Sequence, residues 1–377
     1  MTLLQVAFNS CVLRNLELNW VYHTPHLLKT LLRAAPRLNT LSADLGENDE
    51  TDGSGLVSIA DALPMLRGDP PWWPLRWRSV SVALVEGDAA DALRALAEAL
   101  RLNKDLYDVR VFNLGAEVEP DAFCEMCEAV VATGARSVYL RGFDLLPAAA
   151  AGLATLLQAR CVLSLTLLHK HTGFNSESVK PVAAALKQND TLTSLTLQSV
   201  DLWRDPVAGH AICAALLGHK SIKHLVLSGN CPNFGAGDEL LAAVCKIYAM
   251  LIEANAPALN FLCIADCGLK IAAVQPILAA LRCNTHLQLL DMQLSRTEYY
   301  NAEALAAFEE ELLSAVTANT GLRGLNYILT TTPIRTQIDA MLEVRQNADD
   351  EAERLASSGD TDVVAELGIE AMAGAPL

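Results

Sequence analysis

The residues with the chemistry for catalysis or metal binding are scattered along this sequence. Cys124 and Cys127 form a CxxC pair, a spacing used by zinc and redox sites. The pair lies within DAFCEMCEAVV, whose apolar residues follow a helical stripe, and no second pair lies at zinc-ribbon distance. The sequence therefore predicts two thiols on a helix, with a metal or redox centre as the less favoured alternative.

The other candidates are equally incomplete. His169 and His171 flank Lys170 without a carboxylate or cysteine at ligand spacing, which favours a surface pair. Cys263 and Cys267 fall in a predicted strand and the turn after it, where free thiols behave as small apolar groups. The acidic segment 46–55 lacks EF-hand spacing, so a solvated loop is favoured over a calcium site. Phosphate-binding loops, nucleophile elbows and HExxH motifs are absent from the sequence, so we expect no catalytic residue, cofactor or metal.

Composition narrows the functional classes further. The chain has 377 residues, of which 52% are hydrophobic, so a large core is expected. Its formal net charge of −16 argues against binding to nucleic acid or to an anionic membrane surface. Ten cysteines are too sparse for a disulfide framework, and MTLLQVAFNS has no basic residue ahead of an apolar run. We therefore expect a monomer without a membrane span, in the cytoplasm or another reducing compartment.

A short apolar pattern recurs along most of the chain. In TLTSLTL, Leu192, Leu195 and Leu197 occupy positions 0, +3 and +5, and the same spacing appears in eleven units. Seven of the ten intervals between unit starts measure 25 to 30 residues. The units start at Leu13, Leu38, Trp77, Leu106, Ala135, Val162, Leu192, Ile222, Leu259, Leu287 and Leu322.

Each unit predicts a strand, a turn and a helix. The +3 and +5 positions alternate with +2, +4 and +6, which is strand periodicity, and Ala/Leu-rich stretches at helical spacing follow at 91–103, 178–189 and 274–284. An asparagine stands three residues before the next unit in four cases, and we interpret it as a helix C-cap in the left-handed conformation. Parallel strands are expected at 14–18, 39–42, 78–82, 107–111, 136–140, 163–167, 193–197, 223–227, 260–264, 288–292 and 323–327.

The pattern LxxLxL, a turn, a helix with small residues and then NxxL resembles the leucine-rich repeat of the ribonuclease-inhibitor subtype. This resemblance implies an α/β fold, namely a curved horseshoe-shaped solenoid of about eleven repeats with strands on the concave face and helices on the convex face. The usual Asn or Cys after the second strand leucine appears only as Asn230 and Cys267, so a less regular turn ladder is expected. A doubly wound α/β fold is the rival interpretation, although it does not require a constant period.

Interruptions of the period define the expected organisation. The repeat region is expected at 1–330, with an insertion at about 46–75 in which Trp72 and Trp73 either cover a small core or form a partner-binding knob. Residues 331–346 are predicted to be a capping helix, because the end of a repeat array needs a polar outer face. Residues 347–377 are acidic and poorly patterned, and a loosely ordered tail is expected there.

Because the sequence contains no convincing catalytic or metal-binding motif, we expect the protein to act by binding another molecule. Positions +2, +4 and +6 of each unit face solvent in such an array, and two groups of them stand out. Charged and aromatic side chains occupy two middle units, and apolar ones occupy the late units. In the alternative interpretation, an aspartate pairs with an arginine and the aromatic rings merely cover the pair. The candidate partner-binding residues are Asp108, Arg110, Phe112, Tyr139, Arg141, Val226, Phe261 and Leu289.

The leading hypothesis is a non-enzymatic scaffold that binds a protein partner through the concave face. One form of it places the protein in a bacterial cytoplasm, and another has a pathogen deliver it as an effector into the host cytosol, where the resemblance implies that such repeats also occur. The competing hypothesis is a substrate-recognition adaptor of a ubiquitin-ligase-type complex.

Overall fold

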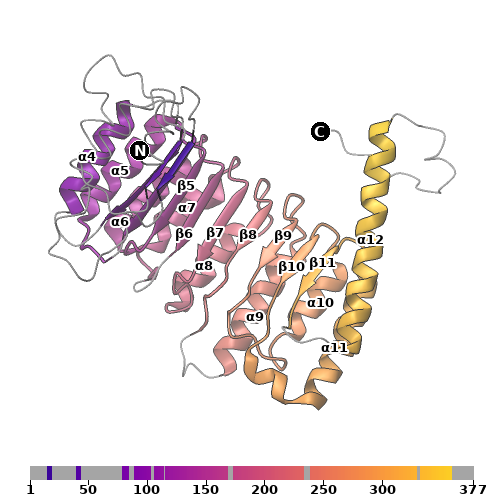
Figure 1. Ribbon diagram of the computed structural model, residues 1–377. Coiled ribbons are helices and arrows are strands. Elements are labelled where there is room, and N and C mark those ends of the chain that lie inside the picture. Colours follow the sequence, from indigo (N-terminus) through magenta and orange to yellow (C-terminus); the bar gives the residue numbers. More distant parts are fainter. Residues whose placement is uncertain are drawn as a thin grey trace, which may run out of the picture.

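The computed structural model (Figure 1) describes residues 15–18, 40–43, 79–84, 89–102, 106–113, 115–168, 173–232, 238–328 and 332–358. Of these, residues 15–18, 40–43, 79–83, 299 and 352–358 are described by their backbone alone. The expected insertion at 46–75 with Trp72 and Trp73, and the His169/His171 pair, lie outside the described residues.

The described strands form one sheet in which every pairing is parallel and the strand order follows the sequence. Each strand begins one residue after the start expected from the repeat, so the expected parallel pairing is confirmed. Sequential order also excludes the doubly wound alternative, in which the strand order reverses. The strands are β1 (Asn15–Leu18), β2 (Thr40–Ala43), β3 (Ser79–Leu84), β4 (Asp108–Asn113), β5 (Ser137–Arg141), β6 (Ser164–Leu168), β7 (Ser194–Gln198), β8 (His224–Val226), β9 (Phe261–Cys263), β10 (Leu289–Asp291) and β11 (Gly324–Asn326).

Helices alternate with the strands from β3 onward, and consecutive helices pack side by side. Five of them, α5, α6, α8, α10 and α12, have proline at the first or second helical position, where its missing N–H costs nothing. The helices are α4 (Ala89–Leu102), α5 (Pro120–Thr133), α6 (Pro147–Gln158), α7 (Val179–Gln188), α8 (Pro206–Leu216), α9 (Asp238–Glu253), α10 (Gln275–Cys283), α11 (Ala302–Ala318) and α12 (Pro333–Ser358), with a 3-10 turn η1 (Arg296–Tyr300) before α11.

The core lies between the sheet and the helices. In β4, Val109 and Val111 are fully buried beneath the helices, whereas Arg110 between them is exposed on the other side of the sheet. The buried apolar residues form one continuous cluster through the described repeats, from Leu84 to Leu342. We call the side of the sheet away from the helices the open face.

The result is a repeat-like α/β arrangement, compatible with a leucine-rich-repeat type of fold. The described sheet is not closed into a barrel, because β1 pairs only with β2 and β11 only with β10. The last helix differs from the expectation. It begins at Pro333 and continues to Ser358, past the boundary expected at residue 346. Residues 347–358 are therefore helical, and 359–377 lie outside the described residues.

The recurring asparagines do end helices, but not in the expected conformation. Asn189, Asn284 and Asn319 are C-caps with φ of −72°, −80° and −82°, which is extended rather than left-handed backbone. The left-handed interpretation is therefore wrong for these three. Their role depends on the side chain, whose amide can both donate and accept.

Each of these side chains bridges two neighbouring units. The Nδ2 group of Asn189 donates to the carbonyl of Leu157 in α6 at 2.5 Å, while its Oδ1 accepts from Leu192 N at 2.7 Å. Asn284 repeats the arrangement, bonding Ile252 O at 2.6 Å and Leu287 N at 2.7 Å. The last carbonyls of a helix lack partners within it, so the next unit supplies the missing donor. We call this series the asparagine ladder.

A histidine takes the same place after α8. His219 stands three residues before the unit start Ile222, and its Nε2–H donates to Leu186 O at 3.1 Å. Its Nδ1 accepts from the backbone N–H groups of Ser221 and Ile222, both at 3.4 Å. This arrangement requires the neutral ring, protonated at Nε2. Burial lowers the pKa of His219, and the hydrogen bond to the Leu186 carbonyl raises it by a smaller amount.

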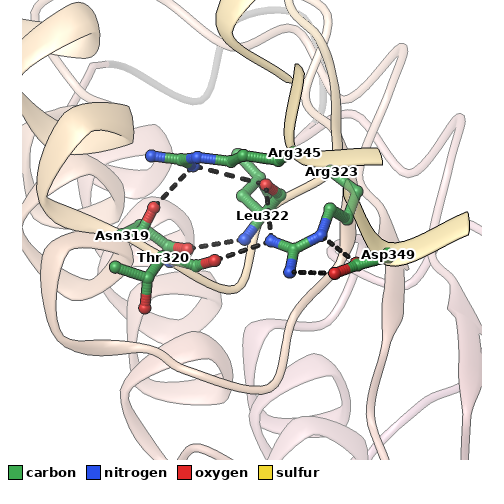
Figure 2. Close-up of polar contacts among 6 residues, drawn as sticks. All are labelled: Asn319, Thr320, Leu322, Arg323, Arg345 and Asp349. Carbon is green, nitrogen blue, oxygen red and sulfur yellow. Dashed lines mark hydrogen bonds and ion pairs between the residues drawn. The ribbon is translucent and has the colours of Figure 1, made fainter. Parts of the chain in front are cut away.

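The ladder ends on the C-terminal helix (Figure 2). Asn319 bonds Leu281 O and Asn284 O, each at 2.7 Å, but in the described residues the element after β11 is α12 and not another strand–helix unit. Arg345 of α12 serves α11 instead, donating to Val316 O at 3.1 Å and Asn319 O at 2.7 Å. Arg323 also binds α12, through an ion pair with Asp349, so two residues of α12 contact the end of the described repeats (Figure 2).

Asn230 and Cys267, the two residues that match the expected turn position, both bond turn backbone. Asn230 is fully buried, and its Nδ2 donates to Leu197 O at 2.7 Å and Leu227 O at 2.8 Å. The Cys267 thiol donates to the same Leu227 O at 3.3 Å.

A buried chain of hydrogen bonds leads to that thiol. Trp203 Nε1 donates to the Tyr248 hydroxyl at 2.9 Å, and that hydroxyl donates to Cys267 Sγ at 3.6 Å. Gly209 makes room for the indole, because a Cβ there would lie 2.4 Å from the Trp203 ring.

Candidate binding surface on the open face

Adjacent strands bring the first group of candidate residues together. The register of β4 and β5 places Arg110 opposite Tyr139 and Phe112 opposite Arg141. Opposite positions in neighbouring strands lie about 5 Å apart, so the four side chains form one patch on the open face. Arg110 and Arg141 are exposed, and the two aromatic residues are half-buried. We call these four residues the β4–β5 patch.

A buried acidic residue, Asp108, accepts hydrogen bonds from Arg110 of this patch and from the neighbouring strand. Asp108 is buried, and its Oδ2 accepts from Arg110 Nε at 2.7 Å. Its Oδ1 accepts from the Ser137 hydroxyl on β5, also at 2.7 Å. The Phe112 and Tyr139 rings lie 5.2 Å apart at a tilt of 39°, an ordinary aromatic contact. The Asp108–Arg110 pair of the alternative interpretation is thus present. It engages Nε of the guanidinium, and 55% of the arginine side chain stays exposed.

The second group of candidates is less contiguous. Phe261 on β9 lies opposite both His224 on β8 and Leu289 on β10, and the His224 and Phe261 rings are 6.2 Å apart. Val226 belongs to the next row, opposite Cys263. Leu289 is 45% exposed and lies over Gly324, where a Cβ would come within 2.4 Å of its methyl group. The structure therefore brings Phe261 and Leu289 together and places Val226 beside them.

Small hydroxyl side chains separate the two groups. Ser164 and Ser194 lie opposite each other on β6 and β7, as do Thr166 and Thr196. The open face thus changes from charged and aromatic, through small and polar, to apolar along the sheet.

Five of the described thiols are buried, whereas Cys283 is exposed. Burial raises the pKa of Cys213, Cys245 and Cys267 to about 12, and raises that of Cys127 well above its usual value. A thiol with a raised pKa carries little thiolate and is a poor nucleophile or metal ligand. Among the described residues, no group of three His, Cys, Asp or Glu side chains is placed to hold a metal ion. None of the described helices combines the length and apolar character that crossing a bilayer requires.

Two features, one buried and one exposed, were not predicted from the sequence. His219 was not recognised as a ladder residue, although its position three residues before Ile222 was a usable signal. The exposed basic residues of the helix-to-strand connections were also overlooked, because they are far apart in sequence.

Comparison of the sequence with protein-family models gives no match, and comparison with curated proteins gives no significant match either. The class defined by fold and surface is therefore a repeat-like α/β protein with an exposed, ordered sheet face.

Proposed function

We propose that this chain is a leucine-rich-repeat protein of the ribonuclease-inhibitor-like subtype, a horseshoe of about eleven repeats, and that it acts as a non-enzymatic scaffold. It binds a protein partner through the open face, which is the concave face of such a horseshoe. The partner contacts the β4–β5 patch first, with Phe261 and Leu289 as a second contact region. Action inside a host cell, after delivery by a pathogen, remains part of this proposal.

The observation that carries the proposal is the β4–β5 patch itself. Arginine and tyrosine are over-represented among the residues that dominate binding energies, because each combines apolar area with directional donors. Here Asp108 and Ser137 hold Arg110 in place before any partner arrives, which lowers the entropy lost on binding. The rigid sheet beneath supports the same role.

The chemistry of the described residues supports a binding role over catalysis. The buried thiols have raised pKa values, and the buried carboxylate of Glu309 is held by hydroxyls, Tyr327 at 2.8 Å and Thr332 at 2.6 Å. These contacts tie the residues that directly follow β11 and directly precede α12 to Glu309 of α11.

The test measures partner binding by matched variants. A partner recovered by affinity capture from host-cell lysate is purified, and its affinity is measured for the unaltered chain and for Arg110→Ala/Tyr139→Ala. Each truncation is expected to cost about 2 kcal/mol, which is roughly thirtyfold in Kd. Arg296→Ala/Tyr300→Ala, on exposed residues of η1, removes the same side-chain types elsewhere and should leave the affinity unchanged.

Two outcomes would redirect the proposal. Unchanged affinity of the β4–β5 double variant, with an unaltered melting profile, would make that patch structural and move attention to Phe261 and Leu289. Recovery of ubiquitin-ligase core subunits in place of a single partner would favour the adaptor hypothesis.

A further inference from the structure

The connections that lead from a helix into the next strand carry a concentration of positive charge. Five consecutive connections, from α4–β4 to α8–β8, together with the last helical turns that lead into them, carry six exposed basic side chains, which we call the basic rim. Asp190 is the one acidic side chain in the described residues of these connections. The basic rim consists of Arg101, Arg136, Arg160, Lys187, Lys220 and Lys223.

The other end of the same strands has the opposite character. In the described connections from β4, β5, β6 and β7 into the following helices, acidic side chains outnumber basic ones, and Arg204 is the basic side chain there. In a chain with a net charge of −16, a rim with the reverse sign is a local exception. The acidic residues are Glu117, Glu119, Asp144, Glu177, Asp201 and Asp205.

The backbone beneath the rim is firmly held. Arg136 N donates to Tyr107 O at 2.9 Å, and Arg136 O accepts from Leu163 N at 2.8 Å. Lys223 N donates to Thr193 O at 2.8 Å, and Lys223 O accepts from Phe261 N at 3.0 Å. The asparagine ladder fixes the same connections through Asn189 and His219. The charges are therefore presented at positions set by the repeat.

The rim is also available for a ligand. The ion pairs among the described residues include none of the six basic side chains. The parallel strands below are about 4.8 Å apart, so five connections extend over about 19 Å. An extended peptide rises about 3.3 Å per residue, so roughly six residues match that length.

We infer that the basic rim binds an acidic, extended segment of a partner protein. Arg136 directly precedes Ser137, and Lys223 directly precedes His224, so the rim is continuous with the open face. A partner lying on that face can place an acidic segment along the rim. The surrounding negative charge and the acidic opposite rim disfavour a long polyanion such as duplex DNA, whose charge would extend past the basic positions.

The test uses a fluorescein-labelled hexaglutamate peptide and the full chain at low ionic strength, with fluorescence anisotropy as the readout. Arg136→Glu/Arg160→Glu/Lys220→Glu should weaken binding by about tenfold or more, because charge at the rim is reversed. The matched control Lys180→Glu/Lys246→Glu/Arg296→Glu changes the net charge equally at exposed positions off the rim, and should weaken binding by less than about threefold. A hexaserine peptide should not bind.

Three results would overturn the inference. They are failure of hexaglutamate to bind the unaltered chain, equal weakening by the rim and control variants, or tighter binding of a short DNA duplex than of the peptide. Melting profiles of both triple variants identify any loss of folding, and single reversals at Arg136 and Lys220 then replace the triple. The rim variants leave the β4–β5 patch intact, so this experiment and that of the proposed function fail independently.

Discussion

The last carbonyl groups of a helix receive hydrogen bonds from different residues in the interior of the asparagine ladder and at its C-terminal end. Inside the array, Asn189 and Asn284 satisfy the last carbonyls of the preceding helix with a short neutral side chain. At the end, Arg345 reaches the carbonyls of Val316 and Asn319 from a separate helix. The same backbone groups are served in both regions, but only the interior solution belongs to the repeat.

This difference shows what the repeat itself supplies. At the ends of α6, α7, α9 and α10, a side chain of the following unit donates to one of the last helix carbonyls. The final helix needs a donor from outside the pattern, and a long cationic side chain can reach several carbonyls together. The substitutions below measure how far the two solutions are equivalent.

The largest effect is expected in the interior, for Asn284→Ala. Asn284 is buried, and its loss leaves Ile252 O and the Leu287 N–H without partners. Unsatisfied buried groups cost about 1–3 kcal/mol each, so we expect a loss of about 3 kcal/mol in the free energy of unfolding. Chemical denaturation measures it. The control is Asn326→Ala, which removes a half-buried open-face side chain that bonds Asp291, and it should cost less than about 1 kcal/mol. Equal losses of unfolding free energy in the two variants would contradict the importance of the ladder.

At the end of the array, Arg345→Met should cost about 2 kcal/mol. Methionine keeps the aliphatic length of the side chain but removes the donors to Val316 O and Asn319 O. Burial, together with the nearby Arg323, lowers the pKa of Arg345, so some desolvation energy is recovered and the loss should be smaller than for Asn284. Arg296→Met provides an exposed control. A larger loss than for Asn284→Ala would mean that the cap, rather than the repeat, dominates stability.

His219 makes the ladder sensitive to pH. Its pKa is lowered in the folded state, so the unfolded chain binds the proton more tightly. The stability associated with this residue is therefore complete above the usual histidine range, and falls as pH decreases through the unfolded-state value near 6.5. His219→Asn should reduce the loss of stability between neutral and mildly acidic pH, measured by denaturation at several pH values. His210→Asn, on an exposed position of α8, should not; a matching change there would refute the role of His219.

The smallest effect is expected for Asp349→Ala. Its ion pair with Arg323 is partly exposed, and surface pairs contribute about 0–1 kcal/mol. The loss should be about 0.5 kcal/mol and should shrink as salt is added. A loss as large as that of Arg345→Met would show that the ion pair, and not the carbonyl contacts, holds α12.

The strands could be predicted because their signal is local. Leucine at 0, +3 and +5 fixes which residues face the helices, and neighbouring strands follow the same register. That register also brought Arg110 beside Tyr139. The same register places Val226 at position +4 of its unit and both Phe261 and Leu289 at position +2, so Val226 lies in a different row. The sequence contains this difference, but the three residues were grouped by hydrophobicity instead of by position.

Longer-range partners were not predictable in the same way. The asparagines were found by recurrence, yet their conformation was wrong because Asn284 bonds a carbonyl 32 residues earlier. His219 was missed because a different residue type makes the same bonds. The end of α12 was placed too early because Asp349 pairs with Arg323, 26 residues away, and its acidic surroundings resembled a tail. The basic rim was not predicted because its residues, such as Arg101 and Lys223, are far apart in sequence and come to the same side of the molecule only when the repeat units stack.

The buried chain from Trp203 through Tyr248 to Cys267 has a consequence for how the molecule unfolds. Ladder residues couple only adjacent units, so by themselves they allow the array to melt one unit at a time from its ends. The Trp203 indole precedes α8, the Tyr248 hydroxyl belongs to α9, and the Cys267 thiol follows β9, so one bond sequence joins three successive units. These units should lose their structure as a single cooperative block, and Trp203 fluorescence would report that event while the ends of the array fray separately.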